Sequence, residues 1–114
     1  MTFNDLVENF KTILTQKYVE FEGRAGRKEF WYFFLVSFVL CFILGFIPVI
    51  GQLVGLALFI PSIAVGARRL HDIGKSGWLQ LLGIIPIVGL IILIVWWAKE
   101  GDKEDNAFGA APTE

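Results

Sequence analysis

The sequence predicts an all-α integral membrane protein with an N-terminal amphipathic helix and three transmembrane helices, of which the first two form an antiparallel hairpin. Three observations lead to this fold class. Hydrophobic residues make up 55% of the 114-residue chain and aromatic residues 15%, which is above the share usual in soluble domains. No charged residue or histidine occurs from residue 30 to 67, or from 76 to 98. A soluble domain needs charged faces at short intervals, so these two stretches indicate a lipid environment.

Residues 1–17 predict the amphipathic helix. Apolar side chains recur there at three- and four-residue intervals, and Thr2 or Asn4 can cap the first turn. Such a helix lies in the membrane interface or packs its apolar stripe on the rest of the protein. Because this helix has few Lys and Arg residues, packing is favoured. The apolar positions are Phe3, Leu6, Val7, Phe10, Ile13 and Leu14.

Residues 18–29 form a basic juxtamembrane segment in which Arg24, Arg27 and Lys28 precede Glu29. Lys and Arg beside a membrane attract anionic lipid headgroups by about 1 kcal/mol each. The lipid bilayer and its anionic headgroups are therefore the expected partners of this segment.

Two spans are predicted next, at about 30–47 and 51–67, each near the minimum length for crossing a bilayer. Pro48 closes the first span, and the uncharged link between them is so short that the two helices must be antiparallel. Small residues on one face let membrane helices approach closely, although glycine is also simply common in such helices. The residues expected at this contact are Ser37, Cys41, Gly45, Gly51 and Gly55.

A third span is predicted at about 78–98, with Ser76 as its N-cap. Trp78 and Trp96 stand near its two ends. They would be separated by roughly 27 Å of helix at ~1.5 Å per residue, which is close to the ~30 Å thickness of the hydrocarbon core. The membrane domain as a whole is expected to cover residues 30–98.

A repeated pattern leaves an alternative open for this third span. Gly45-Phe-Ile-Pro-Val-Ile-Gly51 lies at the expected turn, and Gly83-Ile-Ile-Pro-Ile-Val-Gly89 lies inside the expected helix. The same sequence pattern is not expected to form a turn in one place and a continuous helix in the other. In the alternative, residues 78–98 form a re-entrant pair of half-helices bent at Pro86, which other helices or subunits would have to cover.

The distribution of Lys and Arg sets the expected orientation. The segment 18–29 and the loop 68–77 carry the basic residues, whereas the link between the first two spans has none. Both basic segments, and with them the N-terminus, should face the cytoplasm. With three spans, the polar tail at residues 99–114 then faces the opposite side.

The loop 68–77 also holds the residues most often associated with chemistry. Gly74-Lys75-Ser76 lacks the earlier glycine and the preceding strand of a phosphate-binding loop. His71 and Asp72 cannot complete a tetrahedral metal site alone, and no nucleophile stands out beside a base. We expect no enzyme activity, no catalytic, metal or cofactor site, and no nucleic-acid partner.

An antiparallel hairpin brings the start of the first span and the end of the second to the same depth. Glu29 is therefore expected to pair with Arg68 or Arg69, and the other arginine with Asp72 or a lipid phosphate. The predicted inner-leaflet polar cluster comprises Arg24, Arg27, Lys28, Glu29, Arg68, Arg69, His71, Asp72 and Lys75.

Three motifs resemble the DUF805 family of small bacterial inner-membrane proteins. They are Phe21-Glu-Gly-Arg-Ala-Gly-Arg-Lys-Glu-Phe-Trp31, Arg68-Arg-Leu-His-Asp-Ile-Gly-Lys-Ser-Gly-Trp78 and Asn106-Ala-Phe-Gly109. The resemblance covers nearly the whole chain after the N-terminal helix. It implies an integral membrane protein of the inner membrane and no particular activity, and the predicted spans make that protein multi-pass. The tail departs from the family pattern at Asp105, where a glycine is usual, and at Ala110, where a proline is usual.

Two functional hypotheses remain. In the first, the protein is a non-enzymatic membrane module that forms homo-oligomers or docks a membrane protein partner through its basic cytoplasmic face. In the second, it is a lipid-handling or transporter-like protein with a polar site at the inner leaflet. No ionisable residue lies within a span, where transport pathways usually place one, and this favours the first.

Overall fold

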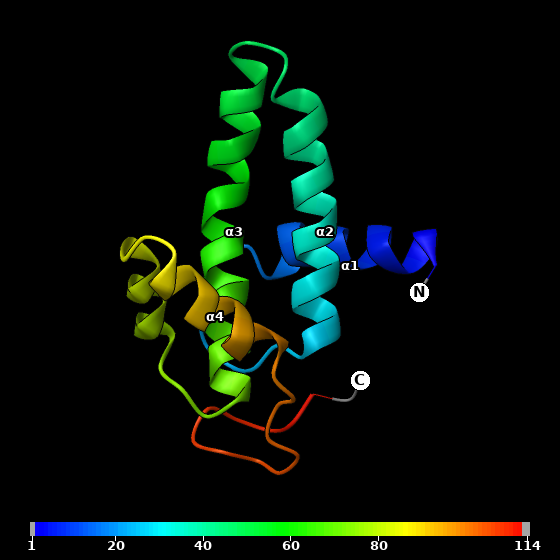
Figure 1. Ribbon diagram of the computed structural model, residues 1–114. Coiled ribbons are helices and arrows are strands. Elements are labelled where there is room, and N and C mark those ends of the chain that lie inside the picture. The colour runs from blue at the N-terminus through cyan, green and yellow to red at the C-terminus, as the bar shows by residue number, and fades with distance from the viewer. Residues whose placement is uncertain (1, 113–114) are drawn as a thin grey trace.

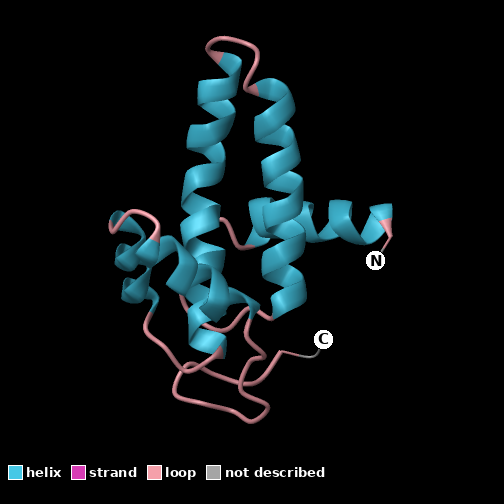
Figure 2. Cartoon of the chain, viewed as in Figure 1, coloured by secondary structure: helices cyan, strands magenta, loops and turns pink. Residues whose placement is uncertain are grey.

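The computed structural model describes residues 2–112, and all the regular elements of this part of the chain are helices connected by turns and loops (Figures 1 and 2). In chain order they are α1 (Phe3–Gln16), α2 (Arg27–Leu44), α3 (Ile50–Asp72), the 3-10 helix η1 (Gly77–Ile84) and α4 (Val88–Ala98).

The longest helices, α2 and α3, lie side by side and run in opposite directions, while α1 runs across α2 (Figure 1). The shorter pair η1 and α4 packs beside α3 in the half of the molecule away from the α2–α3 turn. The C-terminal tail crosses that same end without forming a helix (Figure 2). Segments from both ends of the chain therefore meet where α3 ends.

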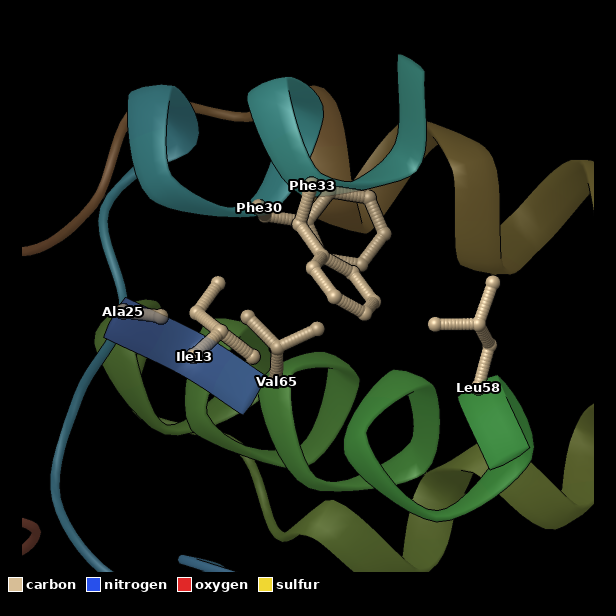
Figure 3. Close-up of a cluster of buried hydrophobic side chains, with 6 residues drawn as sticks. All are labelled: Ile13, Ala25, Phe30, Phe33, Leu58 and Val65. Carbon is tan, nitrogen blue, oxygen red and sulfur yellow. The ribbon is translucent and has the colours of Figure 1, made fainter. Parts of the chain in front are cut away.

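Helix α1 packs against the rest of the protein along its apolar stripe. Thr2 and Asp5 form a capping box at its first turn, in which each satisfies a backbone N–H of the other. Ile13 is fully buried in a cluster with Phe30 and Phe33 of α2 (Figure 3). The ring of Phe10 stacks on that of Phe33 with centroids 5.4 Å apart. Of the two alternatives for this helix, packing is the arrangement observed.

The outer surfaces of α2, α3, η1 and α4 are lined with exposed hydrophobic side chains, for example Phe38 and Leu56, which is 70% exposed. By length and composition, α3 is the helix among the described residues that is long and apolar enough to cross a membrane. Helix α2 has 18 residues, but three of those in its first turn are charged. Helix α4 is apolar and has only 11 residues.

The single helix predicted over residues 78–98 is wrong. The chain forms η1, turns at residues 85–87 and returns as α4. Pro86 has no N–H to donate to a helix, and Ile87 adopts a φ of 65°, which is rare for a β-branched residue and incompatible with a continuous helix. Two half-helices bent at Pro86 match the observed elements.

The repeated Gly-x-Ile-Pro-x-x-Gly pattern forms the same turn twice. Val49 has φ and ψ of 71° and −55°, and Ile87 has 65° and −64°. In each turn the N–H two residues after the proline bonds back to the proline carbonyl, at 2.8 Å for Ile50 and 2.7 Å for Val88. These are γ-turns with positive φ at the centre, a strained type. The pattern therefore means a turn in both copies.

The tail lies on the same side of the protein as the two basic segments. Asp102 N donates to Asp72 O at 2.7 Å, and Asn106 Nδ2 donates to His71 O at 3.0 Å. The expected place of residues 99–114, across the membrane from the basic segments, is therefore wrong for the described part, 99–112. A chain that turns back at Pro86 returns to the side it left.

Candidate functional site

Charged side chains converge where α3 ends. Arg68, Arg69 and Asp72 occupy its last turns and are 2%, 0% and 4% exposed. Charged groups are almost never buried to this extent unless they are paired. With Arg24 and Glu29 they form what we call the buried charge cluster.

Asp72 joins two arginines from different segments. Its Oδ1 accepts from Arg24 Nε at 2.9 Å, and its Oδ2 accepts from Arg69 Nη1 at 2.8 Å. Gly101 of the tail passes so close that an added Cβ would lie 1.8 Å from Asp72 Oδ2. Only glycine fits beside this carboxylate, which therefore fastens three segments at one point.

Glu29 pairs with Arg68, as expected from the antiparallel arrangement. Arg68 Nη1 lies 2.5 Å from Glu29 Oε2, and Lys17 Nζ lies 3.5 Å from the same oxygen. Arg69, the other arginine, pairs with Asp72. Both predicted pairs, Glu29 with one arginine and Asp72 with the other, are therefore confirmed. Arg68 Nε also donates to Glu20 O at 3.0 Å, which connects α3 to the segment after α1.

Arg24 holds the tail in place with the rest of its guanidinium group. Its Nη1 donates to the carbonyls of Glu104 at 2.9 Å and Gly109 at 3.1 Å, and its Nη2 donates to Asp102 O at 2.5 Å. A guanidinium offers five N–H donors in a rigid plane. Arg24 uses that plane to bind a loop with no helical structure of its own.

Arg69 binds the end of α4. It donates from Nε to Trp97 O at 2.9 Å and from Nη2 to Lys99 O. The last carbonyls of a helix lack partners within the helix and carry partial negative charge. Trp31 Nε1 on α2 reaches the same Trp97 carbonyl at 3.3 Å, so α2, α3 and α4 meet at this helix end.

His71 is also held by partners within the chain. Its Nδ1 lies 2.8 Å from Gly23 O, and its ring stacks on Phe108 with centroids 4.2 Å apart and planes 1° apart. Asn106 closes the small turn that presents Phe108. His71 and Asp72 therefore both have polar partners within the chain, Gly23 for the imidazole and two arginines for the carboxylate.

Besides His71, three members of the predicted polar cluster lie outside the buried charge cluster. Arg27 and Lys28 are exposed on the first turn of α2, and they line a cavity of about 400 Å³ together with Lys103 and Asp102 of the tail. Lys75 Nζ lies 4.8 Å from the centre of the Trp96 ring. These cations face the surface of the protein.

The small residues predicted to pack the helices divide into two groups. A Cβ added to Gly51 would lie 2.8 Å from the Cα of Gly45, so those two glycines do bring the backbones together at the turn. A Cβ added to Gly55 would meet nothing within 4 Å. The close contact expected at Gly55 is therefore wrong. Ser37, Cys41 and Gly55 instead line an open apolar groove.

Sequence reasoning missed Tyr18, whose hydroxyl donates to Ala57 O at 2.5 Å. Pro61 stands inside α3 and has no N–H for the carbonyl four residues earlier, which is that of Ala57. A proline inside a predicted span signals such an unsatisfied carbonyl. The sequence does not indicate which distant hydroxyl will reach it.

The arrangement as a whole binds segments of the chain together. No three His, Cys, Asp or Glu side chains among the described residues are grouped so that they could hold a metal ion. Each carboxylate of the buried charge cluster already accepts from at least two cationic groups.

Comparisons with known proteins place these residues in context. Residues 18–110 match the family described as Protein of unknown function (DUF805). The chain is 38% identical over 109 residues to Inner membrane protein YhaH of Escherichia coli (strain K12), which covers 85% of this chain and 90% of the relative. It is 37% identical over 105 residues to Inner membrane protein YhaI of the same strain, covering 85% and 89%. No solved structure matches the chain.

Proposed function

Because the chain belongs to the DUF805 family, we propose that it is a non-enzymatic module of the inner membrane that presents a rigid cytoplasmic platform to a protein partner. The platform consists of residues 18–29, 68–77 and 99–112. The partner is a further copy of the chain or another membrane protein with an acidic surface.

The proposed membrane arrangement has α2 and α3 crossing the bilayer as a pair, with η1 and α4 inserted from the cytoplasmic side. Three observations support it. The relatives are named inner membrane proteins, hydrophobic side chains cover the outside of these four helices, and Lys and Arg gather at one end of the α2–α3 pair. On this arrangement both described ends of the chain lie in the cytoplasm.

The observation that carries the proposal is the internal use of the buried charge cluster. Arg24, Arg69 and Asp72 hold the three platform segments together, so the platform keeps one shape without a ligand. Preorganised surfaces bind partners at a lower entropic cost. Arg27 and Lys28 are exposed on the platform, and exposed cations favour an acidic partner.

In-cell photo-crosslinking tests the proposal. A photoreactive amino acid at Glu22, which is exposed on the platform, should give one discrete adduct, and mass spectrometry would identify the captured chain. The double variant Arg27→Glu, Lys28→Glu should abolish that adduct. The matched control Lys11→Glu, an exposed lysine on α1, should leave it unchanged. No discrete adduct, or an adduct indifferent to the charge reversal, would contradict the proposal.

A lipid-handling role is the second candidate. The observation that favours it is the apolar groove between α2 and α3. The carboxylates of the buried charge cluster are already paired with arginines.

A further inference from the structure

We propose that the groove between α2 and α3 binds one acyl chain of a phospholipid from the leaflet nearest the buried charge cluster. The groove has a volume of about 410 Å³, which is within the range of ~300–1,000 Å³ typical of ligand sites. Residues of α2, most of them phenylalanines, form one wall, and residues of α3 that include Gly55, Leu58 and Phe59 form the other. Its lining includes Phe30, Phe34, Phe38, Gly55, Leu58 and Trp97.

Small residues create this groove instead of closing it. Nothing lies within 4 Å of the position that a Cβ of Gly55 would take, and Ser37, Cys41 and Ser62 add little volume to the lining. Phe33 of α2 and Leu58 of α3, which belong to the buried cluster in Figure 3, also line the groove. The helices touch at the Gly45–Gly51 turn, and the groove lies between that turn and Trp97.

Hydrocarbon is the chemistry that fits the lining. No charged side chain lines the groove, and the hydroxyl of Ser62 donates to Leu58 O at 2.6 Å. An empty space of this size would forfeit the dispersion contacts of every wall atom. The groove opens to the surroundings of the helices, and in a bilayer the nearest filler is a lipid tail.

The length of the groove selects a lipid tail over a helix from a partner. It runs along α2 from Phe30 to Cys41, roughly 16 Å at ~1.5 Å per residue, which is about half of the ~30 Å hydrocarbon thickness and so one leaflet. Its end at Phe30 adjoins Glu29 in sequence, and Glu29 pairs with Arg68. A lipid whose headgroup sits at that level places its tail in the groove. The leaflet is the inner one if the proposed orientation holds.

One hydroxyl distinguishes the two occupants. Ser37 Oγ is buried and has no hydrogen-bond partner among the described residues. A partner helix in the groove would use it, because serine hydroxyls bond across helix contacts in membranes. An acyl chain has no group for it, so Ser37→Ala should leave lipid binding intact.

Native mass spectrometry of the full-length protein, exchanged into phosphatidylglycerol, tests the proposal. Wild type and Ser37→Ala should each retain a single lipid as collision energy rises. Gly55→Phe, which fills the groove, should lose it at the same energy. The matched control Leu56→Phe changes the neighbouring residue, which does not line the groove, and should behave as wild type. Delipidation should lower the melting temperature of wild type and leave that of Gly55→Phe unchanged.

Three results would overturn the inference. Equal lipid retention by Gly55→Phe and Leu56→Phe would mean that the lipid is ordinary boundary lipid. A dimer that both Gly55→Phe and Ser37→Ala abolish would assign the groove to a second copy. A second test uses only the wild-type chain, so it does not depend on the folding of a variant. The chain is labelled with a phospholipid that carries a diazirine in its tail. It should modify peptides within residues 30–41 and 55–65, and labelling spread evenly over α4 would also contradict the site.

Discussion

Asp72→Asn should be among the most destabilising single substitutions in the protein, because it removes the shared partner of two buried arginines. The side chains of Arg24 and Asp72 are 1% and 5% exposed, and that of Arg69 is 0% exposed. The amide keeps the shape of the carboxylate and loses its charge. Breaking a buried ion pair on one side typically costs about 3–5 kcal/mol, and we expect a loss in that range.

The assay is unfolding of the purified protein in nanodiscs, read as the change in free energy of unfolding. The comparison is Glu100→Gln, which breaks the Lys103–Glu100 pair in the same tail. That pair is 83% and 62% exposed, and exposed pairs contribute roughly 0.2–1 kcal/mol. Proteolysis of residues 99–112 should accelerate in Asp72→Asn, since Arg24 loses the carboxylate that orients it toward the tail carbonyls.

A double-mutant cycle separates the two arginines. Asp72→Asn combined with Arg24→Gln should cost less than the sum of the single changes, because the second change removes a charge that the first left unpaired. The reasoning is refuted if Asp72→Asn costs no more than Glu100→Gln, or if the tail resists proteolysis as it does in wild type.

Three further predictions concern the membrane part. In a Cys41→Ser background, an impermeant thiol reagent applied to intact cells should label a cysteine at Gln52 and neither Ser76 nor Lys103; labelling of Lys103 would restore the three-span topology. Ile87→Gly should leave stability unchanged or raise it by up to about 1 kcal/mol, because relief of a positive-φ strain of about 1–3 kcal/mol offsets the greater flexibility of the unfolded chain. A loss above 1 kcal/mol in thermal unfolding would show that the turn carries no such strain. Tyr18→Phe should lower the free energy of unfolding by about 1–3 kcal/mol, because it leaves Ala57 O unpaired. In a Pro61→Ala background, where residue 61 supplies an N–H to that carbonyl, this cost should disappear. A cost that persists there would mean that the hydroxyl acts elsewhere.

The features that could be predicted from sequence are those that depend on neighbouring residues. The spacing of apolar residues in α1 follows from helix geometry. The start of α2 and the end of α3 share a level because the link at residues 45–49 is short. That geometry was sufficient to predict the pairing of Glu29 with an arginine of α3.

Proline shows where such prediction stops. Helix α3 continues through Pro61, whereas η1 ends before Pro86 and the chain turns there. A proline frees a carbonyl in any helix, and the outcome depends on whether a partner is present for it. Tyr18 supplies one for Ala57, and a residue distant in sequence is decisive there. The repeated glycine pattern around Pro48 and Pro86 was the available signal that both form turns.

The sequence by itself determined that the chain is helical and apolar, with its cations gathered beside the apolar runs, because composition and periodicity act locally. Three features were decided by the tertiary structure alone. The tail returns to the basic segments, Arg24 donates hydrogen bonds to the carbonyls of the tail, and Gly55 faces a groove. The physical reason is that the contacts of a buried charge or a small residue depend on which residues lie opposite it in the fold. What lies opposite Asp72, for example, comes from residues 24, 69 and 101, and only the folded chain brings those together.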